Sequence, residues 1–216
     1  MIEIHHLNNS RSQRIVWLAE ELGVPYKVVV HMRDSVTMLA PASLTDIHPL
    51  GKSPIIVDGA LVLPESGAIV EYLTETYGKG QLVPPRGTPE HVRYLYWLHY
   101  AEGSLMTPAL LTLYAGRMGA AAGLLGARAQ GQRSLHLGYL ETELKHAPYF
   151  VGDTFTAADV LMSFPLEFLR SLAPNESYPA IDAYLARLHA RPAYKKALET
   201  GEAPYDLSGY RPPAKT

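Results

Sequence analysis

The chain has 216 residues, of which 47% are hydrophobic and 19% are charged, so a chain that is disordered throughout is not expected. At roughly 150 residues per domain, this length fits one large domain or two small ones. Its 19 basic and 21 acidic residues give a net charge of −2, which argues against a nucleic-acid platform. The sequence has 0 cysteines, which excludes disulfides, cysteine-ligated metals and a thiol nucleophile supplied by the protein.

Neither a signal peptide nor a membrane span is expected. The first residues, Met-Ile-Glu-Ile-His-His, lack a basic region followed by a long apolar run. No uncharged apolar stretch reaches the roughly 18 residues that a membrane span requires. We therefore expect a soluble, cytoplasmic protein.

The first third of the chain alternates between strand and helix patterns. Residues 2–7 alternate in hydrophobicity and predict a short strand, and the valine-rich residues 26–31 predict a second one. Between them, Ser10 and Gln13 have the spacing of a helix-starting capping box, and Gly23 should end the helix. A strand–helix–strand unit of this kind begins a partly parallel sheet.

A hairpin and another helix follow. The apolar runs 55–57 and 61–63 flank an Asp-Gly pair at 58–59, which suits the positive φ of a tight hairpin turn. Beyond it, residues 65–77 predict a helix that Gly78 ends.

The composition then shifts to glycine and proline over residues 80–88, which we interpret as a linker. It separates a first domain, residues 1–79, from a second, residues 89–216. The alanine- and glycine-rich residues 115–131 fit either a loop between two helices or a close-packing helical surface. The second domain shows only helical patterns, at residues 89–117, 128–146, 156–172, 178–190 and 192–200.

One of these helix starts is explicit. Thr156 is followed by Asp159 at the third position, which is an acidic form of the capping box. We interpret the pair as structural: it starts a buried helix and takes no part in chemistry.

Four segments stand in a distinctive order and spacing over about residues 1–200. They are Asn9-Ser10-Arg11-Ser12 leading into Trp17-Leu18-Ala19-Glu20-Glu21-Leu22-Gly23, then His48-Pro49-Leu50-Gly51-Lys52-Ser53-Pro54, Leu63-Pro64-Glu65-Ser66-Gly67-Ala68-Ile69, and Phe155-Thr156-Ala157-Ala158-Asp159. Together they resemble the cytosolic glutathione transferases, with the serine/asparagine-type N-terminal motif of bacterial members. The resemblance implies a thioredoxin-like α/β domain followed by an all-α domain, usually in a homodimer.

The resemblance also implies a binding site for glutathione as co-substrate, with no metal. Glu65 and Ser66 should hold the γ-glutamyl end, because a carboxylate, a hydroxyl and a helix N-terminus suit its ammonium and carboxylate groups. Ser53 should pair through its backbone with the cysteinyl portion, and Pro54 should be the family's cis-proline. Lys52 should pair with the glycyl carboxylate, or else it is only a solvated lysine of the surface.

The thiol of glutathione needs a donor that stabilises its ionised form. A thiol with a pKa near ~8.5 is mostly protonated at neutral pH, and lowering that pKa by two units takes about 2.7 kcal/mol. A helix N-terminus and one hydrogen bond can supply this. Asn9, Ser10 and Ser12 are the available donors. Asn9 falls where several classes of the family place their serine, whereas Ser10 has the typical residue type and could equally be only a helix cap.

The second substrate should be a small apolar electrophile bound against the long helix that follows the linker. Leu105, Met106, Leu110 and Tyr114 share a helical face there, although such a stripe could equally belong to the core. We expect the chain to conjugate glutathione to this electrophile, as in detoxification. The electrophile itself cannot be named from the sequence.

Two other functions stay open. The chain could be a glutathione-dependent reductase of disulfides or peroxides, or a non-catalytic scaffold that binds glutathione. No metal site is expected among the nine histidines, because the adjacent His5 and His6 of the first strand point to opposite faces.

Overall fold

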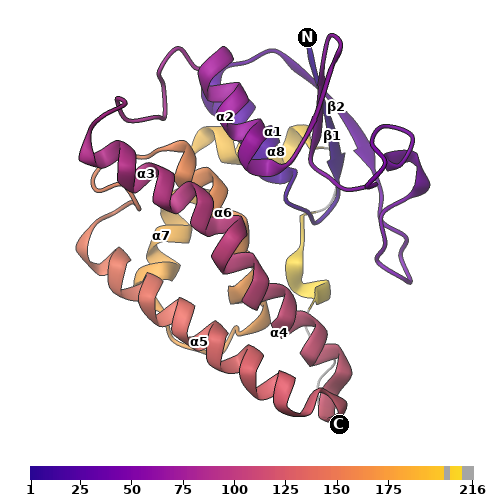
Figure 1. Ribbon diagram of the computed structural model, residues 1–216, viewed down its shortest axis with the longest axis vertical. Coiled ribbons are helices and arrows are strands. Elements are labelled where there is room, and N and C mark those ends of the chain that lie inside the picture. Colours follow the sequence, from indigo (N-terminus) through magenta and orange to yellow (C-terminus); the bar gives the residue numbers. More distant parts are fainter. Residues whose placement is uncertain (202–204, 211–216) are drawn as a thin grey trace. The chain divides into compact units, whose positions relative to one another are not determined.

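The computed structural model describes residues 1–201 and 205–210, which fall into two compact units (Figure 1). Unit 1 comprises Met1–Pro84 and Leu188–Tyr205, and unit 2 comprises Pro85–Arg187 and Asp206–Thr216. The division at residues 84–85 falls within the expected linker. The last helical pattern, by contrast, belongs to unit 1 and not to the helical unit.

Unit 1 is built on a four-stranded sheet in the order β2-β1-β3-β4. Strand β1 pairs parallel with β2 and antiparallel with β3, and β3 pairs antiparallel with β4. Helix α1 follows β1 and helix α2 follows β4, which confirms the predicted α/β domain. The bounds are β1 (Ile2–Leu7), α1 (Gln13–Leu22), β2 (Tyr26–His31), the 3₁₀ turn η1 (Ala42–Leu44), β3 (Ile55–Asp58), β4 (Leu61–Pro64) and α2 (Ser66–Thr76).

The apolar positions of the strands supply the buried core of unit 1. The predicted hairpin is confirmed: Asp58 pairs with Leu61, and Gly59 turns the chain with a φ of 60°. Many apolar side chains of the sheet and its helices are fully buried, among them Ile2, Ile4, Ile15, Leu18, Ile56, Ile69 and Leu73. Ile55 is buried in a separate cluster with Leu7 and Leu44.

Helix α8 (Pro192–Thr200) completes unit 1 by packing on α1. Arg191 makes two hydrogen bonds to the carboxylate of Glu21, at 2.6 and 2.8 Å. The ring of Tyr194 meets Trp17 edge to face at 5.1 Å between centroids. The amphipathic pattern of residues 192–200 predicts the helix, but these partners lie far away in the sequence.

The described residues of unit 2 form helices and no named strand, as predicted, but the first predicted helix is interrupted. The pattern at 89–117 forms two helices joined by a π-helical segment, and residues 115–131 are helical apart from one 3₁₀ turn. The bounds are α3 (Pro89–Tyr100), the π segment η2 (Ala101–Leu105), α4 (Met106–Met118), the 3₁₀ turn η3 (Gly119–Ala122), α5 (Gly123–His146), α6 (Ala157–Leu172), α7 (Pro179–His189) and the 3₁₀ turn η4 (Leu207–Tyr210).

Asp159 organises the buried start of α6. Its carboxylate accepts hydrogen bonds from the backbone N–H of Thr156 at 2.8 Å and from the Thr156 hydroxyl at 3.1 Å. It also accepts from the backbone N–H of Phe150 at 3.0 Å and from the Tyr184 hydroxyl at 3.1 Å. The predicted cap is therefore present, and it ties three segments of unit 2 together.

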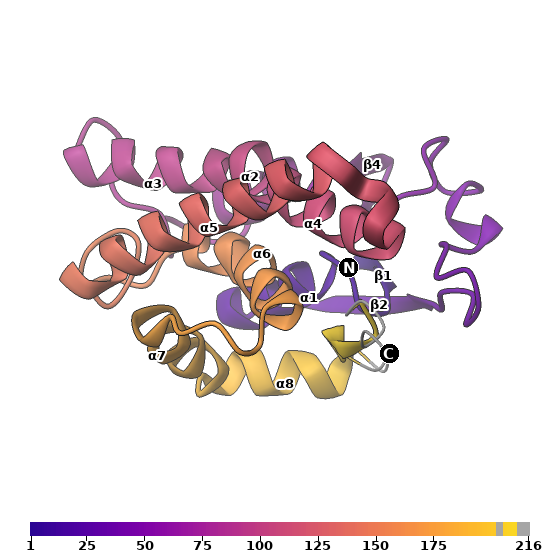
Figure 2. The same cartoon turned by 90° about the horizontal axis from the view of Figure 1, so that it is seen from below.

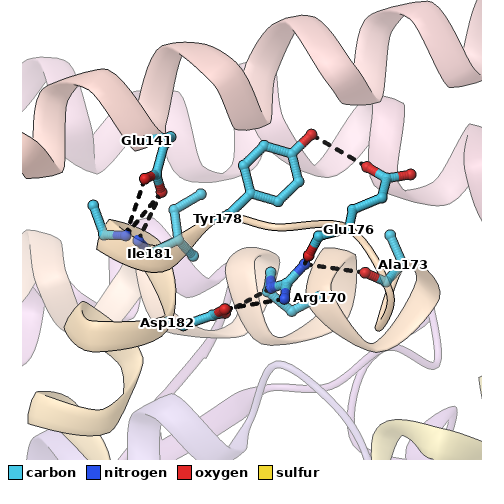
Figure 3. Close-up of polar contacts among 8 residues, drawn as sticks. Glu141, Arg170, Ala173, Glu176, Tyr178, Ile181 and Asp182 are labelled. Carbon is cyan, nitrogen blue, oxygen red and sulfur yellow. Dashed lines mark hydrogen bonds and ion pairs between the residues drawn. The ribbon is translucent and has the colours of Figure 1, made fainter.

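A second carboxylate serves α7 in the same way (Figure 3). Glu141 on α5 accepts from the backbone N–H groups of Ala180 and Ile181 in the first turn of α7, at 3.0–3.1 Å. Arg170 on α6 donates to the carbonyl oxygens that precede α7 and, at 2.8 and 3.2 Å, to the carboxylate of Asp182. The connection between α6 and α7 is therefore held by Arg170 from α6 and by Glu141 from α5.

Replacing Asp159 with alanine should lower the free energy of unfolding by roughly 3–5 kcal/mol, because four buried donors lose their acceptor. Urea unfolding followed by circular dichroism measures this loss. Asp153→Ala is the matched control, since Asp153 is an exposed acid in the preceding loop and should change stability by at most about 0.5 kcal/mol. A similar small loss in both variants would contradict the role of Asp159.

Candidate functional site

The candidate site is built at the carboxyl end of β1. This strand pairs with β2 as far as Leu7, whereas its pairing with β3 ends at His5. The chain then turns through Asn8, whose side-chain oxygen accepts from the backbone N–H of Arg33 at 2.7 Å. The backbone N–H of Asn8 donates to the carbonyl of His31 at 3.3 Å. Asn8 therefore fixes the start of the loop that leads into α1.

The hydroxyl of Ser12 is the centre of a buried polar network. Its Oγ accepts from the backbone N–H of Leu7 at 3.1 Å and lies 2.9 Å from Nδ1 of His6. It also lies 2.7 Å from Oγ of Ser10. All three side chains are buried, and Ser10 retains only 4% of its surface. The loop is thus tied to the strand by a chain of hydrogen bonds.

The ring of His6 is neutral at neutral pH. Burial, with a further contribution from the nearby His31, lowers the pKa of His6 to about 4. The Ser12 hydroxyl proton then has three possible acceptors. Ser12 can donate to His6 while accepting from Ser10, it can donate to Ser10 while accepting from His6, or it can donate to the carbonyl of Leu7 at 3.3 Å. The second arrangement leaves the Ser10 hydroxyl proton for a group outside the network.

The predicted capping box at the start of α1 is not formed. Oγ of Ser10 accepts from the backbone N–H of Ser12 at 3.2 Å, and α1 begins at Gln13 with Ser12 as its N-cap residue. The Nε2 atom of Gln13 is buried without a hydrogen-bond partner among the described residues. The correct spacing was present, but Ser10 is drawn into the network around Ser12 instead.

Asn9 differs from the two serines in its exposure. Ser10 and Ser12 are buried, whereas Asn9 is partly exposed at the turn of the loop. Its φ of 51° lies in the left-handed region, which asparagine tolerates better than most residues. Of the three predicted thiol donors, Asn9 is therefore the one that is not buried.

Glu65 and Ser66 lie where α2 begins, as predicted. Glu65 is exposed and has a φ of 75°, a conformation that costs about 1–3 kcal/mol in a residue with a side chain. Ser66 is buried, and its Oγ accepts from Arg14 at 3.2 Å. Because that oxygen accepts from Arg14, the Ser66 hydroxyl proton is left to donate to another group. The first N–H groups of α2 have no intrahelical acceptor.

Arg14 connects this helix start with the loop after β1. Its side chain is buried, and its Nε donates to the carbonyl of Arg11 at 3.3 Å while Nη2 reaches Ser66. Neither Arg14 nor His6 was among the predicted site residues. For His6, the sequence does contain an indication. Strand alternation places His6 on the same face as Ile4, which is buried, so a buried polar side chain could be expected there.

Residues 52–54 reach the same end of β1 from the other side. The Ser53–Pro54 peptide bond is cis, as the resemblance implies. Oγ of Ser53 donates to the carbonyl of His5 at 2.9 Å. Lys52 is exposed and Pro54 is buried. The structure therefore brings the loop after β1, the cis-proline turn and the start of α2 together within unit 1.

The other strand histidine has separate partners. Nδ1 of His5 lies 3.1 Å from Nε2 of His31, and Nδ1 of His31 lies 2.9 Å from Oγ of Ser43. Burial lowers the pKa of His5 and of His31. Within residues 1–201 and 205–210, no group of three or more His, Asp or Glu side chains could hold a metal ion.

The expected electrophile stripe is only partly at the surface. Leu105 and Met106 are buried in the core of unit 2, Leu110 is half-buried, and Tyr114 is 53% exposed. The stripe therefore divides into an inner part that packs and an outer part that can meet a ligand.

Comparisons with known proteins cover both units. The family model for the glutathione S-transferase N-terminal domain matches residues 10–76, and that for the C-terminal domain matches residues 126–192. Glutathione S-transferase 3 of Schizosaccharomyces pombe is 35% identical over 218 residues, which cover 94% of this chain and 88% of that protein.

Solved structures show the same relationship. A glutathione S-transferase from Actinobacillus pleuropneumoniae has a TM-score of 0.87 at 35% identity, with 98% of this chain and 100% of that chain covered. A glutathione transferase family member from Pseudomonas fluorescens, with two glutathione bound, shares the fold at a TM-score of 0.77 and 22% identity over 92% of each chain. These relatives come from a fungus and from bacteria, so the bacterial type of the N-terminal motif stays a prediction.

The buried neutral ring of His6 should make the protein sensitive to acid. The folded state binds the His6 proton with a pKa of about 4, against 6.5 when the ring is unperturbed. Above pH 6.5 the neutral ring makes its full contribution to the free energy of unfolding. As the pH falls from 6.5 towards 4, the unfolded state binds the proton first, and about 3 kcal/mol of this free energy is lost.

His6→Asn tests this effect, because the Asn oxygen can still accept from Ser12 but does not titrate. Urea unfolding at pH 7 and at pH 4.5 should show a much larger loss of stability in the wild type than in the variant. His99→Asn, at an exposed histidine of α3, should keep most of the wild-type pH dependence. Equal pH dependence in the wild type and His6→Asn would contradict the role of His6.

Proposed function

The chain belongs to the glutathione S-transferase family, and we propose that it conjugates the thiolate of glutathione to a small apolar electrophile. The observation that carries the proposal is the convergence of two helix N-termini, a cis-proline turn and uncharged donors at the end of β1. Such a set suits a peptide with carboxylates at its ends and a thiol between them. A role in detoxification and a cytoplasmic location are part of this proposal.

The γ-glutamyl end of glutathione would bind at the start of α2. The carboxylate there would accept from the free N–H groups of the first helical turn and from the Ser66 hydroxyl. Arg14 orients that hydroxyl by donating to its oxygen. The exposed carboxylate of Glu65 would receive the ammonium group. The left-handed backbone of Glu65 supports this role, because strained residues persist where the surrounding structure requires them.

The remainder of the tripeptide would lie along the cis-proline turn. The backbone of Ser53 would pair with the cysteinyl portion, while its side chain is held on the carbonyl of His5. The exposed ammonium of Lys52 would then meet the glycyl carboxylate. This pair is solvent-exposed, so it should contribute no more than about 1 kcal/mol.

The thiolate would form beside Asn9, at the N-terminus of α1. The amide of Asn9 is the accessible donor of the loop, and the first N–H groups of α1 add a favourable dipole. Ser10 and Ser12 would support it by holding the loop on β1. Together, one hydrogen bond to the charged sulfur and the helix dipole supply roughly 2–4 kcal/mol, enough to lower the thiol pKa by two units.

The electrophile would contact the outer part of the α4 stripe, where Leu110 and Tyr114 keep accessible surface. These side chains offer apolar contact and one hydroxyl, which suits a small apolar molecule with limited polarity. Leu105 and Met106 would back this surface from the core.

We also infer a homodimer, with α3 and α5 contributing to its interface. Val92 and Tyr96 on α3 and Leu135 and Tyr139 on α5 are exposed, each pair at a spacing of one helical turn. The hydroxyls of Tyr96 and Tyr139 lie 3.1 Å apart, which joins the two pairs into one patch. Apolar and aromatic side chains gathered in this way are typical of subunit interfaces.

Titration of bound glutathione by its ultraviolet thiolate absorbance tests the proposed function. The bound thiol should have a pKa about two units below that of the free thiol. Asn9→Ala should raise that pKa and lower kcat/KM roughly 10- to 150-fold, because one hydrogen bond to a charged sulfur is lost.

The matched comparison is Ser10→Ala, which removes a buried hydroxyl of the same loop. A larger effect of Ser10→Ala than of Asn9→Ala would assign the thiol contact to Ser10, through the proton arrangement in which His6 donates. Tight binding with an unshifted thiol pKa would instead favour the reductase or the scaffold. Absence of glutathione binding would overturn the proposed site.

Sedimentation velocity tests the dimer. The wild type should sediment as a dimer, and Leu135→Asp should shift it to the monomer, because an uncompensated charge in an apolar interface is costly. Leu124→Asp is the matched control on the same helix and should leave the dimer intact. A monomeric wild type, or a dimer that tolerates Leu135→Asp, would contradict the assignment.

A further inference from the structure

The end of the α4–α5 hairpin carries an unusual run of sequence. From Met118 to Ala127, ten consecutive residues (Met-Gly-Ala-Ala-Ala-Gly-Leu-Leu-Gly-Ala) have no polar side chain. Most of them are exposed, and Leu124 keeps 91% of its surface. Met118 and Leu125 are also exposed. We call these ten residues the hairpin tip. Single exposed leucines are common on soluble proteins, but a run without any polar side chain is not.

The packing of the hairpin leaves these larger side chains outside. Helices α4 and α5 lie side by side and meet at the turn η3 (Figures 1 and 2). The small side chains of Ala115, Ala122 and Ala129 form the buried contact near the turn, with Leu111 packed against them. Gly119 and Gly123 reverse the chain with φ values of 55° and 48°. The hairpin is thus closed by alanines, Leu124 stays almost fully outside, and Leu125 keeps 42% of its surface.

The charged residues that flank the tip in the sequence have one sign. Between Gly103 and Leu140 the sequence contains no Asp or Glu, and its charged residues are Arg117, Arg128 and Arg133. Arg133 pairs with Glu176. Arg117 and Arg128 are exposed and stand directly at the two ends of the tip. An apolar run that is flanked in the sequence by arginines suits a partner that is apolar inside and negatively charged at its surface.

The hydropathy of the region agrees with such a partner. The helical stretch Pro89–His146 contains an 18-residue window with a mean hydropathy of 1.2, of which only 22% is buried. This is the one window of its kind among the described residues. Because the chain reverses at η3, the apolar residues are presented at the end of a hairpin and not along one straight helix.

We propose that the hairpin tip binds the surface of an anionic lipid bilayer. Leu124, Leu125 and Met118 would enter the boundary between headgroups and acyl chains, and Arg117 and Arg128 would meet the lipid phosphates and carboxylates. A lipid surface fits better than a protein partner. The apolar side chains of the hairpin tip can enter a bilayer surface without a pocket of complementary shape. The inference concerns the tip alone and does not depend on the proposed conjugation.

Vesicle flotation with the full chain tests this proposal. The protein should float with vesicles of phosphatidylcholine and phosphatidylserine, much less with pure phosphatidylcholine, and less at high salt because the charges are screened. Leu124→Ser and Leu125→Ser should each weaken binding about tenfold, since each removes an apolar side chain from the lipid boundary. The double variant Arg117→Gln with Arg128→Gln should remove the preference for phosphatidylserine.

The matched control is Val36→Ser, at a residue of unit 1 that is 88% exposed. It should bind vesicles like the wild type. Circular dichroism should show unchanged thermal unfolding for Leu124→Ser, because that side chain packs against nothing in the fold. Each of three results would overturn the proposal: no flotation with phosphatidylserine vesicles, flotation unaffected by Leu124→Ser, or loss of self-association in Leu124→Ser without any lipid binding.

Discussion

The site depends on how the buried polar groups at the end of β1 are paired. A buried hydroxyl or N–H without a partner costs about 1–3 kcal/mol, so the loop after Leu7 has few ways to leave the sheet. The Ser12 hydroxyl meets the backbone N–H of Leu7, the ring of His6 and the Ser10 hydroxyl at once. This fixes where α1 begins and leaves Asn9 at the exposed turn. On the neighbouring residue of β1, the carbonyl of His5 receives Ser53 and places the cis-proline turn beside the loop.

Local patterns were sufficient for the elements of unit 1 but not for the contacts that complete its site. Alternation located the strands, and the Asp-Gly pair located the hairpin, because both depend on neighbouring residues. The capping box at Ser10 failed because its spacing is also local, while the competing partner, the Ser12 hydroxyl, is anchored on a buried strand. Arg14 and Ser66 are 52 positions apart, and Arg191 and Glu21 are 170 apart. Periodicity contains no information on such pairs.

The described site relies on oriented dipoles more than on titrating groups. Its histidine is kept neutral by burial, and its buried arginine donates to a hydroxyl and a carbonyl. Two helices begin at the same edge of the sheet, each with N–H groups that lack intrahelical acceptors. Dipoles held in this way need little reorganisation when a negative charge appears beside them. In the proposed function, these dipoles would stabilise the thiolate without a protein base and without a cysteine.

Helix α5 shows how composition along one helix separates two kinds of surface. Around Leu135 and Tyr139 the exposed side chains include aromatic hydroxyls, which can form hydrogen bonds with a partner of fixed shape. Around Leu124 they are aliphatic, and the nearest charged residues in the sequence are arginines. Leu124 and Leu135 lie eleven positions apart, or roughly 16 Å along a helix, so one surface can be occupied without covering the other. Because alanines close the hairpin, the leucines at its end contribute little to the fold. Their exposure costs solubility without adding stability, and contact with a lipid surface would offset that cost.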